Sequence, residues 1–276
     1  MSLVPPRRQL DIGRPQGAQT ADRALQLLHV VSEATESGCR LSDLAQTTSL
    51  SLPTAHRLLA VLARFGLIEQ DAQTRRYHLG IELLRLGNLA GRRFSIVGLA
   101  RDEVSHLAET TGDTVFMSIR DHDESVCVDR RVGSFPIKTL TLEIGDRRPL
   151  GVGSCSLALL AALGDDEIER ILADDKSRAS HYPQFHASTL RRLVQAARRE
   201  GFAFNDGRIV SGMSAVGVPV LDGSGQPLAA LSIAAINARM DRTRRHAVAA
   251  KLKEASQRIQ QRLVQRPAAQ LVTANR

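Results

Sequence analysis

The stretch from Thr47 to Gly80, TTSLSLPTAHRLLAVLARFGLIEQDAQTRRYHLG, decides how the N-terminal third of this chain folds. It opens in a polar turn, continues with Pro53 at the head of an apolar run of helical spacing, and stops at Gly66. Proline suits the first helical turn because the N–H that it lacks has no partner there, and glycine is common just past a helix end. The pattern predicts a helix that starts at Leu52 and ends at Gly66.

Two helices are expected before this one and a hairpin after it. The segment QTADRALQLLHVVSEA predicts the first helix, with Thr20 as its N-cap, and RLSDLAQTTS predicts a shorter second helix, with Ser42 as its N-cap. Only a few Thr and Ser residues separate the second helix from the third, which is helix-turn-helix spacing. Residues 67–70 and 75–79 then predict two strands around the turn DAQT. Together these elements predict a winged helix-turn-helix.

In such a domain the third helix enters the DNA major groove and the hairpin contacts the backbone or minor groove. A guanidinium can bind a guanine edge or a phosphate, and the sequence leaves both open for Arg57. Pairing of Arg57 with the nearby Asp43 is the structural alternative. The residues expected to face DNA are Leu52, Thr54, Ala55, His56 and Arg57 on the helix and Arg75 and Arg76 on the hairpin.

Length and composition indicate a globular protein with two modest domains. The chain has 276 residues, of which 43% are hydrophobic and 24% charged. It has no apolar run near the roughly 20 residues that span a bilayer and no signal-peptide pattern, so we expect a cytoplasmic protein without membrane association. Cys39, Cys127 and Cys155 are odd in number, far apart and form no CxxC, so we expect reduced packing residues, with neither a disulfide framework nor a zinc site. No metal or cofactor is expected.

The charge balance favours a polyanionic partner. The net charge is +8; residues 1–95 carry 12 Lys+Arg against 8 Asp+Glu and the remainder 25 against 21, which is +4 for each part. The excess is therefore denser per residue in the N-terminal third, as a DNA-binding domain requires. A solvated basic face is the alternative.

The rest of the chain predicts a connecting helix and an α+β domain. Helical spacing interrupted by glycines predicts a linker helix that ends near Arg93 and a new helix over residues 96–110. Alternation predicts strands at DTVFMSIR, ESVCVDRRV, FPIKTLTLEIG, MSAVGVPVLD and QPLAALSIAAI. Helices are expected at SCSLALLAAL, DDEIERILAD, HASTLRRLVQAARREG and residues 242–265. Strands, then helices, then strands indicate helices packed on an antiparallel sheet.

The segment RRPLGVGSCSLALLAAL carries the strongest ligand-binding pattern. Glycines and small residues lead into a helix, where free backbone N–H groups and the helix dipole favour a carboxylate or phosphate. A tight loop that needs glycine for its turns is the alternative. Cys155 as a redox sensor is a second one, although nothing in the sequence indicates a lowered thiol pKa.

The segments DRALQLLHVVSEA, LSDLAQTTSLSLPTAHRLLAVLARFGLIEQD and RRYHLGIELLRLG resemble the DNA-binding half of the IclR family of bacterial transcriptional regulators. One departure is Pro53, where the family commonly has serine. The resemblance extends to the second half, which matches the GAF-like effector domain, and implies a linker helix that helps to form a dimer. The expected divisions are a flexible tail (1–19), the winged helix-turn-helix (20–80), the linker helix (81–95), the effector-binding and oligomerisation domain (96–265) and a second tail (266–276).

The resemblance also places an effector pocket. Family pocket positions map onto Gly153, Ser154, Cys155, Asn205, Ala215, Ser232 and Ala234. The chain departs from the family pattern Thr-Ala-x-Gly-Lys-Ala, for which it has residues 153–158, GSCSLA, and it has Arg208 where glutamate is frequent. We therefore expect a less acidic, more apolar pocket and a small carboxylate-bearing effector, aromatic acids included.

The resemblance implies a homodimeric or tetrameric regulator, not an enzyme, that binds a pseudo-palindromic operator under control of this effector. One alternative keeps DNA binding and leaves the second domain only an oligomerisation role. The other is a nucleotide-dependent enzyme, because GVGSCS approaches GxGxxG; however, the third glycine is replaced by Ser156, and Asp174 and Asp175 follow a helix instead of ending a strand. No GxSxG hydrolase motif is present.

Overall fold

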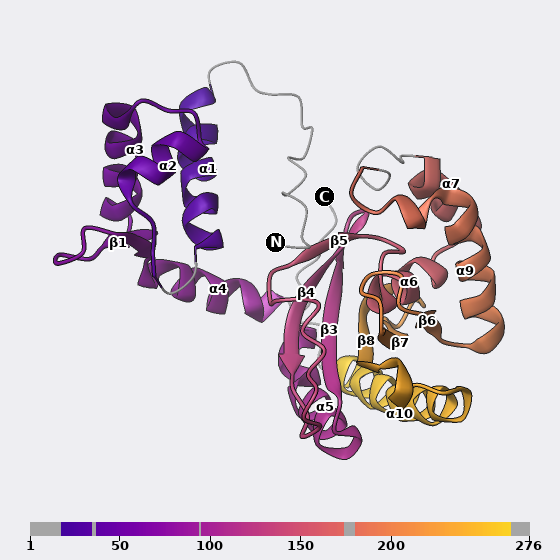
Figure 1. Ribbon diagram of the computed structural model, residues 1–276. Coiled ribbons are helices and arrows are strands. Elements are labelled where there is room, and N and C mark those ends of the chain that lie inside the picture. The colour runs from indigo at the N-terminus through magenta and orange to yellow at the C-terminus, as the bar shows by residue number, and fades with distance from the viewer. Residues whose placement is uncertain (1–17, 35–36, 94, 174–179, 266–276) are drawn as a thin grey trace. The chain divides into compact units, whose positions relative to one another are not determined.

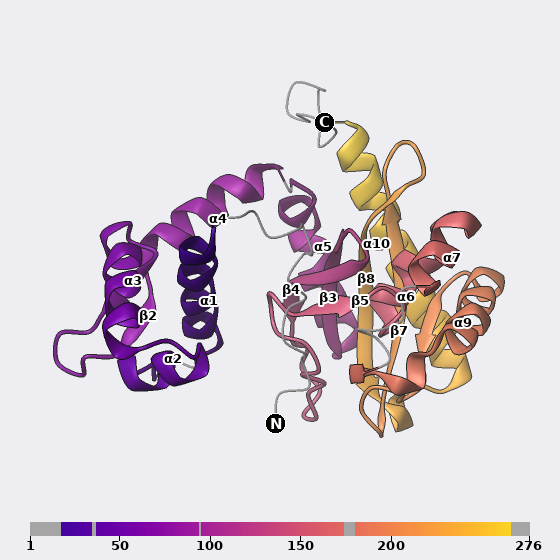
Figure 2. The same ribbon diagram turned by 90° about the horizontal axis from the view of Figure 1, so that it is seen from above.

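The computed structural model describes residues 18–34, 37–93, 95–173 and 180–265. These residues form two compact units, one that ends at Arg93 and one that follows it (Figures 1 and 2). The expected tails, 1–19 and 266–276, lie outside the described residues except for residues 18 and 19. Gln19 already belongs to the first helix, so the expectation of a tail up to residue 19 is wrong at its last residue.

The N-terminal unit is a winged helix-turn-helix, as the sequence predicts. Its hairpin pairs Ile68 with Leu79, and its core contains buried residues of the first three helices and both strands, including Leu27, Leu44 and Leu59. Its elements are α1 (Gln19–Glu33), α2 (Leu41–Thr47), α3 (Leu52–Arg64), β1 (Ile68–Gln70), β2 (Tyr77–Leu79) and α4 (Ile81–Arg93).

The ends of α3 follow from the residues expected to set them. Ser51 is the N-cap, and its Oγ accepts a hydrogen bond from the backbone N–H of Thr54 at 3.4 Å. Pro53 lies in the first turn, where no N–H is needed, and Gly66 follows the helix with φ +68°, a conformation that glycine adopts without steric cost. The serine cap therefore stands just outside the helix, one position before the first helical residue.

Three predicted boundaries in this unit are wrong. Helix α1 begins after Ala18 and α2 after Arg40, so Thr20 and Ser42 lie inside their helices instead of capping them. The Ser42 hydroxyl hydrogen-bonds Asp43 at 3.0 Å. Strand β2 begins two residues later than predicted because Arg75, with φ +57°, still belongs to the turn.

The C-terminal unit contains one six-stranded antiparallel sheet of order β5-β4-β3-β8-β7-β6. Its strands are β3 (Thr114–Asp121), β4 (Glu124–Arg131), β5 (Arg147–Pro149), β6 (Ala203–Asn205), β7 (Met213–Leu221) and β8 (Pro227–Ile236). Its α-helices are α5 (Ser95–Thr111), α6 (Ser154–Ala161), α7 (Asp165–Ala173), α9 (Ala187–Glu200) and α10 (Arg242–Val264), with short 3₁₀ turns at Pro183–Phe185 and Asn237–Arg239.

Helices cover both faces of this sheet. Helices α6, α7 and α9 pack on one face, and α5 and α10 pack on the other (Figures 1 and 2). Strand alternation divides β8 between the two cores: Leu231 and Ile233 enter the α5/α10 core, whereas Ala230 and Ala234 enter the α6 core. The small side chains on the α6 face leave room for that helix to approach the sheet closely.

The expectation of a strand over FPIKTLTLEIG is wrong. The place beside β4 is taken by β5, which pairs with residues 124–126. Side chains, instead of a neighbouring strand, bind carbonyls of the loop: Arg130 donates to the Leu142 carbonyl and Arg148 to that of Thr141. The short strand β6 was missed because three residues carry too little alternation to detect.

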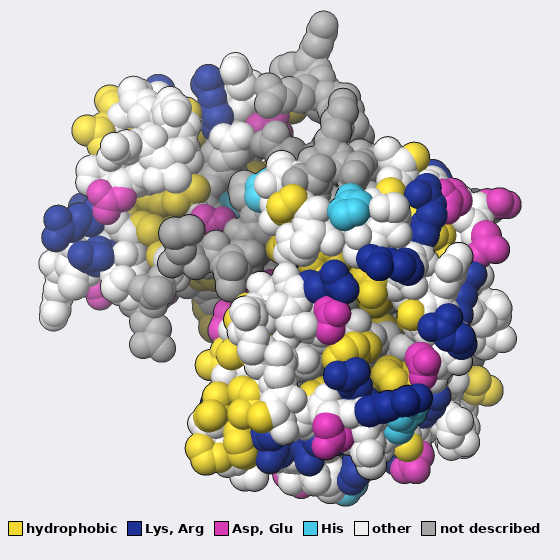
Figure 3. Space-filling view, turned by 45° about the vertical axis from the view of Figure 1, so that its right-hand side comes forward, with side chains coloured by type: hydrophobic (Ala, Val, Ile, Leu, Met, Phe, Trp, Pro, Cys, Tyr) yellow, Lys and Arg dark blue, Asp and Glu magenta, His cyan; other side chains and the backbone are white. Residues whose placement is uncertain are grey.

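Charge is spread over the surface of the C-terminal unit. On the face seen in Figure 3, Lys and Arg side chains stand among acidic ones. Many of the arginines are paired, for example Arg191 with Glu169 and Arg198 with Asp165. None of the helices in the described ranges combines the length and apolar content that crossing a bilayer requires.

We expect Gly217→Ala to destabilise the C-terminal unit by about 1–3 kcal/mol through overpacking. A Cβ on Gly217 would lie 2.4 Å from the carbonyl oxygen of Ser154, so α6 would have to move off β7. The measurement is thermal or urea unfolding of the full chain. Gly223→Ala is the matched control, because a Cβ there meets nothing within 4 Å and should shift stability by less than about 0.5 kcal/mol. Equal stability of the two variants would contradict the close approach.

Candidate functional site

Of the five residues of α3 that are expected to meet DNA, three are exposed. Leu52 is 52% exposed, and His56 and Arg57 are exposed beside it. Ala55 is 0% exposed, so the expectation that it faces outward is wrong. Its spacing from Leu59 places it on the buried stripe of the helix, because residues four apart share one face.

No partner occupies Arg57 in the part of the chain that the structure describes. Its guanidinium makes no hydrogen bond or ion pair there, and Asp43 instead accepts from the Ser42 hydroxyl. The alternative pairing of Arg57 with Asp43 is therefore wrong. A cation on the first turns of an uncovered helix face can reach phosphates or base edges.

The hairpin presents one of its two arginines and anchors the other. Asp71 Oδ1 accepts hydrogen bonds from the backbone N–H groups of Gln73 and Thr74, and the Thr74 contacts hold the Asp71 pKa below its usual value. Arg75 follows this turn and is exposed. Arg76 Nη1 instead donates to the carbonyls of residues 37 and 38, at 3.1 and 3.0 Å, and so ties the hairpin to the segment before α2.

The C-terminal unit contains a cavity at the N-terminus of α6. The space between its lining residues is about 340 Å³, its open mouth included. The structure brings all seven predicted effector residues to its wall: Gly153, Ser154, Cys155, Asn205, Ala215, Ser232 and Ala234. Sequence reasoning missed further lining residues, chiefly Phe116, Thr141, Leu142, Arg148, Val152 and Ile209.

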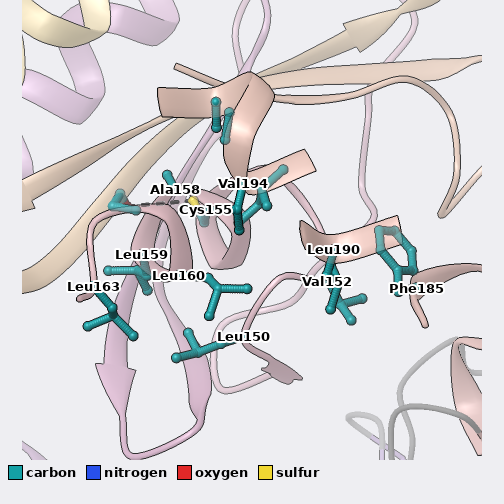
Figure 4. Packing of buried hydrophobic residues seen from close by; sticks show 14 of the residues in the cluster. Leu150, Val152, Cys155, Ala158, Leu159, Leu160, Leu163, Phe185, Leu190 and Val194 are labelled. Carbon is teal, nitrogen blue, oxygen red and sulfur yellow. Dashed lines mark hydrogen bonds between the residues drawn. The ribbon is translucent and has the colours of Figure 1, made fainter. Parts of the chain in front are cut away.

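Strand register and helix packing explain why distant residues meet there. Asn205 pairs with Ala215, which pairs with Ala234, so three neighbouring strands place these residues in one row. Helix α6 closes the cavity from above the sheet. Its apolar side chains pack against α9, where Leu190 and Val194 lie near Leu160 (Figure 4).

Glycines form the turn into α6. Gly151 and Gly153 have φ of +94° and +95°, which side chains with a Cβ rarely adopt. Both glycines are therefore needed for the turn itself, which agrees with the alternative of a tight loop that needs glycine. The turn also leaves the first N–H groups of α6 without a side-chain cap, because the N-cap is Gly153.

A buried hydroxyl and thiol cluster lines the floor. The Cys155 thiol donates to Ser232 Oγ at 3.2 Å, and the hydroxyls of Ser125 and Ser156 hydrogen-bond each other. Burial raises the pKa of Cys155, and it raises the pKa of Cys127 to about 12. Both thiols are therefore protonated at neutral pH, which argues against the redox-sensor alternative.

Arg148 is the charged residue of the cavity wall. It is 4% exposed; its Nη2 donates to the Thr141 carbonyl at 2.6 Å, and its Nε has no partner in the described ranges. Burial lowers the pKa of its guanidinium. The sequence signal for Arg148 is the segment DRRP, because two successive residues of a strand point to opposite faces of the sheet. Arg147 pairs with Asp121 and Glu124 on one face, so Arg148 points to the other.

The surroundings of GVGSCS do not fit a dinucleotide site. That site requires a parallel strand, a glycine turn and a crossover helix. Here the preceding strand, β5, is three residues long and antiparallel to β4. In the described ranges no three His, Cys, Asp or Glu side chains gather as a metal site would require.

Comparison with known families identifies the chain. Residues 20–72 match the IclR helix-turn-helix domain, and residues 90–261 match the domain described as bacterial transcriptional regulator IclR C-terminal. The chain belongs to the IclR family. It is a DNA-binding transcriptional regulator, as are its curated relatives.

Among these IclR-family relatives is the regulator XynR of Escherichia coli K12, 29% identical over 230 residues that cover 81% of this chain and 88% of the relative. The BhcR regulator of Paracoccus denitrificans is 28% identical over 88% of this chain and 86% of its own. The crystal structure of an IclR homolog from Microbacterium hydrocarbonoxydans complexed with 4-hydroxybenzoate is 22% identical, with a TM-score of 0.76 over 89% of this chain and 99% of that one. This last likeness supports the fold.

We expect no fast-reacting thiol in the native protein and three after unfolding. Cys127 and Cys155 are buried, and burial also raises the pKa of the half-buried Cys39. The measurement is reaction with a chromogenic aromatic disulfide at pH 8, with and without denaturant. Rapid native labelling mapped to Cys155 by mass spectrometry would restore the redox alternative.

Proposed function

We propose that this regulator binds a pseudo-palindromic operator as a homodimer, and that a small organic acid in the α6 cavity changes its operator affinity. The observation that carries the effector part is the partly polar cavity, open at its mouth, at the N-terminus of α6. The space between its lining residues, about 340 Å³, includes the open mouth, so the part that the protein encloses is smaller. A metabolite with few heavy atoms fits this space better than a nucleotide.

On the DNA side, α3 supplies the reading surface. Leu52, Thr54 and His56 meet base edges or the thymine methyl group in the major groove, and Arg57 binds a base edge or a phosphate. Arg75 contacts the backbone from the hairpin. Arg76 has a positioning role, because its bonds to the segment before α2 hold the hairpin in place.

Helix α4 supports the dimer. Ile81, Leu84 and Leu89 are exposed by 73%, 60% and 45%, and this apolar strip fits a second copy of the same helix. Two-fold symmetry of the protein then gives operator half-sites a fixed spacing. Pairing of dimers would give the tetramer.

The cavity lining favours an acid with an apolar body. Phe116, Ile209, Ala215 and Ala234 offer hydrocarbon contact, and the N-terminus of α6 favours a negative charge. Asn205 adds a side-chain amide whose Oδ1 has no partner in the described ranges. A family relative is crystallised with 4-hydroxybenzoate, which makes aromatic acids the first class to test.

We expect Arg57→Ala to weaken binding to the operator by about 1–3 kcal/mol, which is roughly 5- to 150-fold. Fluorescence anisotropy with the upstream intergenic DNA and a scrambled duplex, over a salt series, measures this. If Arg57 contacts a base, the substitution relaxes the sequence preference. If it contacts a phosphate, the substitution weakens binding to both DNAs and lowers the salt slope by about one. Arg199→Ala on α9 is the control, since it removes the same charge from an exposed site in the other unit. Equal effects of the two variants would contradict the assigned role of α3.

We expect an acid that binds the cavity to change operator affinity by about 5- to 150-fold. The same anisotropy assay with 4-hydroxybenzoate, benzoate and short-chain acids measures this change, and isothermal titration measures binding itself. Binding without a change in operator affinity, or no binding of any acid, would favour the alternative in which the second domain only oligomerises.

A further inference from the structure

Arg148 is buried without a counter-ion. A guanidinium keeps its charge in proteins, and a buried charge is stabilised only by a nearby opposite charge or by a full set of hydrogen bonds. Arg148 is 4% exposed and has neither in the described ranges: its Nη2 binds a neutral carbonyl, and its Nε has no partner.

The surrounding carboxylates are engaged elsewhere. Asp146 acts on Arg148 only through its longer-range field, and its Oδ2 accepts the backbone N–H of Glu143 at 2.7 Å. Asp121 at the end of β3 and Glu124 at the start of β4 pair with Arg147. Tyr182 interacts with Arg148 through a side-chain hydrogen bond, but burial raises the pKa of its phenol, so it is neutral and supplies no counter-charge.

A second electropositive feature lies against the guanidinium. A Cβ built on Gly153 would lie 3.1 Å from Arg148 Nη1, so the guanidinium abuts the residue that caps α6. The N–H groups of the first turn of this helix carry the positive end of its dipole and have no side-chain cap. Arginine and helix terminus therefore act on the same end of the cavity.

The rest of the wall carries no charge. Of the described residues that line the cavity, Arg148 is the charged one; the others are apolar, or are neutral serine, threonine, cysteine and asparagine. One positive end and an uncharged remainder match a ligand with one acidic group and a neutral body.

We propose that the cavity binds a monocarboxylate whose carboxylate supplies the counter-ion that Arg148 lacks, held between the guanidinium and the first turn of α6. The proposal rests on the effector role proposed above and specifies its chemistry. Arg148 then determines specificity: it selects acids over their amides, and one carboxylate over two.

The experiment compares acids with their uncharged amides. Isothermal titration of the full chain uses benzoate against benzamide and butyrate against butyramide, with wild type, Arg148→Met and Arg147→Met. We expect wild type and Arg147→Met to bind an acid at least 10-fold more tightly than its amide. Arg148→Met should bind that acid at least 10-fold more weakly and lose the preference. Arg147 is the matched control because it is the adjacent arginine, paired outside the cavity.

A second readout separates ligand recognition from a structural role. Without ligand, Arg148→Met should unfold at the same temperature as wild type or higher, because the substitution removes an unpaired buried charge. Should Arg148→Met fail to fold, Arg148→Lys keeps the charge but loses the planar fork, and we expect it to retain the acid preference with lower affinity.

The outcomes distinguish the role of Arg148 from the proposed effector function of the cavity. Acid binding that is unchanged in Arg148→Met overturns the role of Arg148 and leaves the effector proposal standing. A folded Arg148→Met that is less stable than wild type, with the acid preference intact, makes Arg148 a structural clamp for the Thr141 loop. Wild type that binds neither acid nor amide overturns both proposals.

Discussion

The close approach of α6 to β7 is the constraint on which the C-terminal unit depends. Gly217 has no side chain where the carbonyl of Ser154 approaches it. On the same face of the sheet, Ala215, Ala230 and Ala234 have short side chains that let the helix lie close to the strands. The helix therefore starts almost on the strands, and its N-terminal turn faces the sheet instead of solvent. Larger residues on this face would lift the helix and separate the polar groups that meet at its start. Packing and site are thus set by the same small residues.

The cavity combines this packing with an unfavourable electrostatic feature. Folding removes the Arg148 guanidinium from water, and the protein supplies only part of the hydrogen bonding that water provided. The apolar cores on both faces of the sheet supply the stability that such a site requires. An arrangement that is suboptimal for stability is typical of binding sites, where the missing partner is the ligand.

The N-terminal unit follows the opposite design. The buried stripe of α3, which includes Ala55, Leu59 and Leu62, holds this helix against the other helices. The outward face of α3 makes no ion pair among the described residues. Arg57 is left without a partner, and Arg76 is committed to the fold. Arg75 and Arg76 are adjacent on the hairpin, but Arg75 is exposed at the turn whereas Arg76 binds carbonyls of the segment before α2.

The sequence by itself determined the winged helix-turn-helix, the linker helix and the order of most elements in the second unit. Caps, glycine stops and periodicity act over a few residues, so the local sequence contains them. It also indicated seven residues of the cavity wall, through resemblance to a family and not through geometry, and missed Arg148. It did not indicate where short elements such as β6 lie, or that FPIKTLTLEIG would form no strand.

Only the tertiary structure decided which side chains are buried and which lack partners. Ala55 and Arg57 lie two residues apart in one helix, and packing against the other helices buries the first and leaves the second exposed. Arg147 and Arg148 are adjacent and chemically identical, but strand alternation directs one to carboxylates at the surface and the other into the cavity. Charge and composition are properties of residues, whereas desolvation and pairing are properties of their three-dimensional neighbours.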